Sequence, residues 1–180
     1  MKRIVLTLIA VAVVAFTASA QQASAPEANP VSNALRRLVE TNSKNMIASA
    51  EEMPADKYSF RPTPAQMSFG ILVVHAARMN YRFCSMIAGT EAPKTAEVKD
   101  TDPKDTLVAA LKSSFDFCTQ SFANLDDSKL GEQVPFFGGR MASRGAIIVT
   151  LAEDYGDHYS TAAMHLRLNG LLPPTAQPRK

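Results

Sequence analysis

The sequence TLAEDYGDHYSTAAMHLRLNG, residues 150–170, contains the pattern that decides the fold. It is typical of one long helix that ends at Asn169 and Gly170, a pair that commonly stops a helix. Asp154 and His158 are four residues apart in it, and residues at this spacing share one helix face. A carboxylate and an imidazole placed in this way can share one metal ion or one proton.

Apolar side chains at helical spacing predict three further helices, over residues 33–52, 68–89 and 103–124, and the 150–170 pattern extends back to a helix over 141–169. No stretch has a convincing strand pattern, although PFFGGR, residues 135–140, suits a short hairpin or a tight turn because two adjacent glycines tolerate positive φ. The sequence therefore predicts an all-α protein, a four-helix bundle.

The polar connection over residues 90–102 is long for a tight turn between antiparallel helices. We expect a crossover that returns along the bundle, so that the second and third helices are parallel. The first and fourth helices would then run in the opposite direction.

The first twenty residues have the order of a secretory signal peptide: a basic MKR start, an apolar run, and a cleavage site at Ala18-Ser19-Ala20. The other interpretation is an uncleaved membrane anchor, but the apolar run is short for the about 20 residues that span a bilayer. We expect a signal peptide over 1–20, a flexible tail over 21–30, one bundle domain over 31–174 and a C-terminal tail over 175–180. The predicted location is periplasmic or secreted, with no stable membrane anchor.

The formal net charge of the full sequence is +2, and removal of the signal peptide would leave the chain close to neutral. There is no basic patch or stripe of the kind that binds nucleic acid, so a nucleic-acid partner is not expected. The expected partner is a small-molecule ligand or substrate, and a homodimer is compatible with the sequence.

Cys84 and Cys118 are the two cysteines of the chain. With the second and third helices parallel, both fall near the same end of the bundle, and an exported protein meets oxidising conditions in which a disulfide persists. We favour a Cys84–Cys118 bridge, and the alternative is two buried free thiols.

The same counting places His75, in the second predicted helix, at about the height of Asp154, since each helical residue rises about 1.5 Å. His75, Asp154 and His158 therefore form a candidate metal site. Two histidines and one carboxylate with open positions suit Zn, Ni or Fe(II). The same side chains also fit a hydrogen-bonded core network or a position facing solvent.

Two other residues of the fourth helix bear on this site. Asp157 is the candidate for an outer group that orients His158. His165 lies two turns beyond His158, too far to share an ion with Asp154, and is expected to be a hydrogen-bonded core or rim histidine. The sequence assigns no catalytic acid, base or nucleophile.

Two segments resemble the DinB/YfiT-like superfamily of four-helix-bundle metalloenzymes: MPADKYSFRPTPAQMSFGILVVHAA (53–77) and DHYSTAAMHLRLNGLLPP (157–174). The resemblance implies a metal held by one histidine of the second helix and an H-x-x-x-H pair of the fourth. His75 and His158 match two of these positions, and Asp154 stands where histidine is usual, as a carboxylate does in some relatives. Ser160-Thr161 replaces the usual Gly-Gln.

Two functions remain open from the sequence. The first is an exported metal-dependent hydrolase or transferase that acts on a small molecule. The second is a non-catalytic, disulfide-linked periplasmic binding or stress module that kept the bundle without a metal.

Overall fold

Four long helices build the protein, for which a computed structural model describes residues 25–178. They are α1 (Pro30–Glu52), α2 (Phe69–Ala88), α3 (Lys104–Phe122) and α4 (Arg144–Leu168). The predicted signal peptide lies outside the described residues, and so does the first part of the predicted tail. Within the described part of the chain, no helix combines the length and the apolar character needed to span a bilayer.

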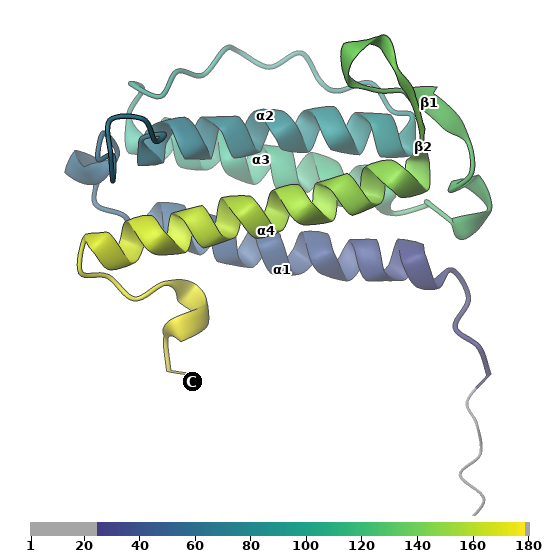
Figure 1. Cartoon of the computed structure of the whole chain (residues 1–180), viewed down its shortest axis with the longest axis horizontal. Helices are drawn as coiled ribbons and strands as arrows, with labels where there is room; N and C mark the ends of the chain where they lie inside the picture. Colours follow the sequence, from purple (N-terminus) through teal and green to yellow (C-terminus); the bar gives the residue numbers. More distant parts are fainter. Residues whose placement is uncertain (1–24, 179–180) are drawn as a thin grey trace, which may run out of the picture.

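The four helices form a bundle in which α2 and α3 run in one direction and α1 and α4 in the other (Figure 1). The segment between Gly89 and Pro103 returns along the length of α2 before α3 begins (Figure 1). Each of α2 and α1 packs against both α3 and α4. The predicted four-helix bundle with a long crossover between the second and third helices is confirmed.

Local sequence sets the ends of α2 as predicted. The hydroxyl of Ser68 accepts a hydrogen bond from the backbone N–H of Ile71, which satisfies one of the free donors at a helix start. Gly89 follows the last turn with φ 70°, a left-handed conformation that glycine adopts without steric cost. Both ends of the predicted helix are therefore correct to within one residue.

The start of α3 has no side-chain cap. Pro103 occupies the position before the first helical residue and makes no side-chain cap. The carboxylate of Asp102 instead accepts a hydrogen bond from the backbone N–H of Lys99, so it closes the turn that precedes the helix.

A small hairpin connects α3 to α4. Strands β1 (Gln133–Pro135) and β2 (Met141–Ser143) are antiparallel, with Val134 opposite Ala142. Gly138 and Gly139 lie between them with φ 68° and 72°, so the segment is a hairpin with its two glycines in the left-handed region. Of the two alternatives for residues 135–140, a short hairpin or a tight turn, the structure shows the hairpin; its three-residue strands are too short to leave a periodic signal in the sequence. Short 3₁₀ helices lie at η1 (Ala55–Lys57), η2 (Asp127–Lys129), η3 (Phe137–Gly139) and η4 (Pro174–Ala176).

The bundle core is apolar and is crosslinked once. Its largest fully buried side chains come from all four helices and include Leu35, Phe69, Phe115, Phe122, Ile147 and Tyr155. Cys84 of α2 and Cys118 of α3 form a disulfide across the core, with their Cα atoms 5.2 Å apart. The predicted bridge is confirmed, and it joins the two parallel helices directly.

Candidate metal centre

Three side chains from two antiparallel helices meet between α2 and α4. His75 comes from α2, and Asp154 and His158 come from adjacent turns of α4. One ligand atom of each residue lies within 4.8 Å of those of the other two. The two imidazole rings are perpendicular, with their centroids 5.0 Å apart. The structure therefore brings together all three residues that the sequence singled out.

Burial differs among the three groups. His158 is 5% exposed, whereas His75 and Asp154 are half-buried. The site is thus closed on the side of the core and partly open on the other. A ligand that reaches it would approach past His75 and Asp154.

One carboxylate oxygen of the cluster lacks a hydrogen bond. Oδ2 of Asp154 is buried and has no hydrogen-bond partner. It lies 3.3 Å from Nδ1 of His158, close enough for an ion pair, but the two atoms do not have the geometry of a hydrogen bond. Buried polar atoms normally have a hydrogen-bond or ionic partner. A cation placed between these two atoms would supply the partner that Oδ2 of Asp154 lacks.

The spacing of the donors also fits one ion, with a small adjustment. Two ligands that bind the same zinc at about 2.1 Å each lie at most about 4.2 Å apart. The three ligand atoms all lie within 4.8 Å of one another, so at most a small side-chain rotation brings every pair within this limit. Residues and geometry thus fit a single divalent ion.

Electrostatics keep Asp154 and His158 in the protonation states that a metal requires. Burial, with a smaller contribution from the charge of Asp157, raises the pKa of Asp154 to about 6. Burial, followed by the proximity of His75, lowers the pKa of His158 to about 4. At neutral pH Asp154 is therefore mainly a carboxylate, and His158 is neutral with a free lone pair.

Asp157 is exposed. Among the hydrogen bonds of residues 25–178, none joins its carboxylate to His158. Its effect on the cluster is electrostatic: its negative charge raises the pKa values of both Asp154 and His158.

His165 lies apart from the cluster. Its side chain is fully buried against Phe60 and Phe69, at ring-centroid distances of 5.8 and 5.7 Å. Neither of its ring nitrogens has a hydrogen-bond partner. The prediction that His165 belongs to the core is correct, but the prediction that it is hydrogen-bonded was wrong, because its neighbours are aromatic rings.

The sequence matches a known protein family. A family model described as the DinB superfamily matches residues 38–162, a range that includes all three residues of the cluster. No curated protein sequence matches the chain.

Solved structures with the same fold are known. A DinB-like protein from Bacillus subtilis is similar with a TM-score of 0.66 at 20% identity, over 82% of this chain and 100% of that one. A DinB-like protein from Bacillus cereus gives a TM-score of 0.65 at 15% identity, over 79% and 95% of the two chains. A conserved protein from Enterococcus faecalis gives 0.62 at 15% identity, over 77% and 96%. At these identities the likeness concerns the fold alone.

Proposed function

The chain belongs to the DinB superfamily, and from this premise we propose that it is a divalent-metal-dependent enzyme that hydrolyses a small molecule or transfers a group to one. The observation that carries the proposal is the cluster of His75, Asp154 and His158, in which a buried carboxylate oxygen has no hydrogen-bond partner. The family membership supports a metal at this place, and the donor set supports zinc, nickel or iron(II).

Each residue has a defined role in this proposal. One ring nitrogen each of His75 and His158 and one oxygen of Asp154 would hold the ion, and the carboxylate would offset one of its two positive charges. A bound divalent ion supplies Lewis-acid activation of a carbonyl group or of water. Three protein ligands leave coordination positions for a substrate, on the side where His75 and Asp154 are only half-buried.

We also propose that the protein is exported and works in the periplasm or outside the cell. The signal-like order of residues 1–20 supports this location. The disulfide between Cys84 and Cys118 is compatible with it, since such bonds persist in oxidising compartments.

The metal content of the protein tests the proposal. The full chain is produced without a histidine tag, stripped with a chelator, loaded with Zn²⁺ and desalted, and the bound metal is then measured by native mass spectrometry. We expect one ion per chain in the wild type. His158→Ala and His75→Ala should weaken binding by more than the about 10- to 100-fold that outer partners of metal ligands cost.

Glu153→Gln is the matched control. This exposed carboxylate is adjacent to Asp154 in sequence, so its loss changes the local charge without removing a donor of the cluster. It should bind as much metal as the wild type. Equal, substoichiometric metal in the wild type and in His158→Ala would refute the proposed site.

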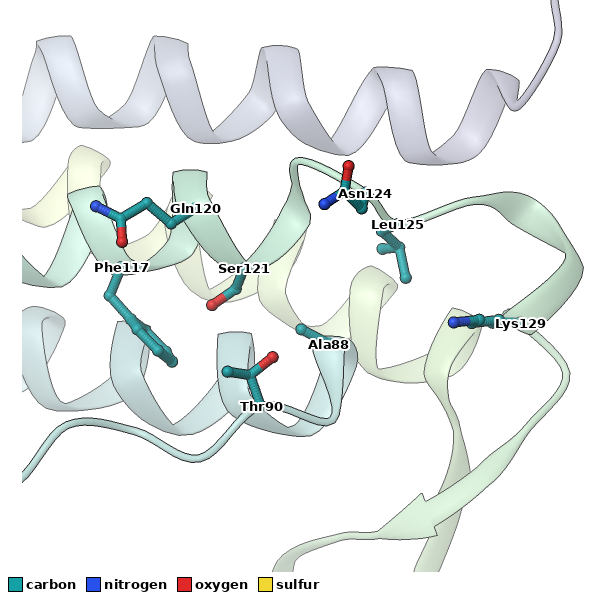
Figure 2. Close-up of a pocket in the computed structure, with 8 residues that line it drawn as sticks. All are labelled: Ala88, Thr90, Phe117, Gln120, Ser121, Asn124, Leu125 and Lys129. Atoms are coloured by element: carbon teal, nitrogen blue, oxygen red, sulfur yellow. The ribbon is translucent and has the colours of Figure 1, made fainter.

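A second candidate function is a non-catalytic binding module without a metal. The observation that favours it is a cavity lined by polar side chains at another part of the bundle (Figure 2). His75→Ala separates the two functions. It abolishes metal uptake in the first case, and in the second it changes only stability, and only slightly, because His75 is half-buried.

A further inference from the structure

A positively charged side chain lies on the same side of α2 as the candidate metal centre. Arg82 is seven residues beyond His75. Seven residues make almost two whole turns of a helix, so the two side chains leave α2 in nearly the same direction, with about 10 Å between them along the axis. Because the metal centre is open on the side of His75, a ligand held there can extend along α2 toward Arg82.

The hairpin between α3 and α4 holds the guanidinium of Arg82 in place. The Cζ atom of Arg82 lies 3.9 Å from the centroid of the Phe137 ring, within the range of a cation–π interaction. Phe137 packs edge-to-face against Phe83 of α2, with ring centroids 5.5 Å apart, and against Phe136 at 4.7 Å. The hairpin stands beside the end of α2 (Figure 1). Arg82 therefore has a defined position before a ligand binds, which lowers the entropic cost of binding.

The same guanidinium has no anionic partner within the protein. Among the hydrogen bonds and ion pairs of residues 25–178, none uses the side chain of Arg82. Stacking on Phe137 covers one face of the planar guanidinium, so the N–H groups at its edge remain free to donate. Arg140 adds a second positive charge to the hairpin, with its Cζ atom 5.8 Å from the ring of Phe136. This end of α2 therefore attracts an anion.

The side chains at helical spacing between the metal centre and Arg82 carry no charge. Met79 lies one turn beyond His75 and is half-buried. On the antiparallel α4, Thr150 lies one turn before Asp154, and its hydroxyl donates to a backbone carbonyl of its own helix. A thioether side chain adapts its shape to an apolar neighbour. A hydrocarbon chain can therefore lie along Met79, and Thr150 requires no hydrogen bond from it.

We propose that the substrate of the metal centre is an elongated carboxylate, whose carboxylate group lies about 10 Å from its reacting group and binds Arg82. A guanidinium binds a carboxylate through two parallel N–H···O hydrogen bonds. Phe137 is a positioning residue, because it holds the guanidinium without contacting the substrate. The inference rests on the proposed metal-dependent function and adds the chemical class of the substrate.

Titration calorimetry on the Zn²⁺-loaded full chain tests this inference with two probes. Suberic acid monohydroxamate binds zinc through its hydroxamate and ends in a carboxylate, about 9 Å away in an extended chain with C–C bonds of about 1.5 Å. Its methyl ester has the same chain without the charge. We expect the acid to bind at least about tenfold more tightly than the ester, the lower end of what hydrogen bonds to a charged group contribute.

Three variants locate the origin of this preference. Arg82→Met should abolish it and leave the affinity for the ester unchanged. Phe137→Leu should reduce it, because the guanidinium loses the ring that holds it. Arg78→Met is the matched control: Arg78 is an exposed arginine of the same helix that pairs with Glu97 of the crossover, so its loss should leave the preference for the acid as in the wild type.

The ester separates a failure of this inference from a failure of the metal centre. If the ester binds the Zn²⁺-loaded chain no more tightly than the metal-free chain, the metal centre is refuted, and the carboxylate site with it. If binding of the ester depends on zinc but the wild type binds acid and ester equally, the carboxylate site alone is overturned. An unchanged preference for the acid in Arg82→Met would have the same meaning.

Discussion

At the scale of single residues, His165 shows how strongly burial controls a titratable group. Its imidazole is fully buried between aromatic rings and neither nitrogen is hydrogen-bonded. This desolvation lowers the pKa of His165 below its usual value, because a charged imidazolium would have no partner there. The folded protein thus holds His165 neutral at a pH where the unfolded chain binds a proton.

The consequence is a loss of stability in mild acid. The folded pKa is lower than the unfolded value of about 6.5, so below that pH the unfolded chain takes up more protons. The free energy of unfolding then falls by up to about 1.4 kcal/mol per pH unit, until the folded group also titrates. We expect His165→Leu to remove this contribution, so that the variant loses less stability than the wild type between pH 7 and pH 5.

Urea unfolding of the metal-free proteins at the two pH values measures the difference. Phe69→Leu is the control, because it alters the same aromatic cluster without removing a titratable group and should lower stability about equally at both pH values. Parallel pH dependence in His165→Leu and the wild type would contradict the assignment.

Residues also differ in how far the sequence predicts the position and contacts of their side chains. Asp154 and His158 were found from their four-residue spacing, and His75 from its depth along α2, because helix geometry fixes both quantities. The orphaned nitrogens of His165 were not found, since they depend on rings contributed by Phe60 and Phe69, outside its own helix.

At the scale of elements, side chains from distant segments cover several helix ends. Lys104 donates to the carbonyls of Glu51 and Met53 at the end of α1. Asp127 accepts hydrogen bonds from Ser32 at the start of the same helix. Local caps such as Ser68 and Gly89 are readable from sequence, but these distant caps are not, because their partners are up to 95 residues apart.

Arg144 caps the C-terminal end of α2 from the start of α4. Its guanidinium donates to the carbonyls of Met86 and Ile87, at 3.2 and 2.5 Å, and pairs with Glu132 at 2.9 Å. The side chain is 12% exposed. Arg144→Met should lower the free energy of unfolding by about 1.5–3 kcal/mol, the usual contribution of hydrogen bonds to a charged group.

Thermal and urea unfolding at constant pH measure this cost. Arg167→Met is the control, because Arg167 is exposed and makes no ion pair among the described residues. This substitution should change the free energy of unfolding by no more than about 0.5 kcal/mol. Equal effects of the two substitutions would show that the cap at the end of α2 does not contribute.

At the scale of the whole molecule, the directions of α3 and α4 decide where the disulfide and the candidate metal centre lie. The long crossover makes α2 and α3 parallel (Figure 1), which brings Cys84 and Cys118 to the same depth. The antiparallel direction of α4 brings Asp154 beside His75. Loop length and helix counting predicted this topology. The cavity of Figure 2 was not predicted, because its lining comes from three separate segments that share no motif.

The disulfide should contribute a large part of the stability of this bundle. It closes a segment of 34 residues, and the chain-entropy model assigns a loop of that length about 3–4 kcal/mol. Cys84→Ala/Cys118→Ala should lower the urea midpoint accordingly, and a reductant should lower the wild type toward the double variant while leaving the variant unchanged. A disulfide-bonded sulfur cannot be alkylated until the bond is reduced. Alkylation of both thiols in the native protein without a reductant would therefore refute the bond. A bridge also explains why two fully buried sulfur atoms meet between parallel helices joined by a long crossover: the link holds together the pair that no short loop restrains.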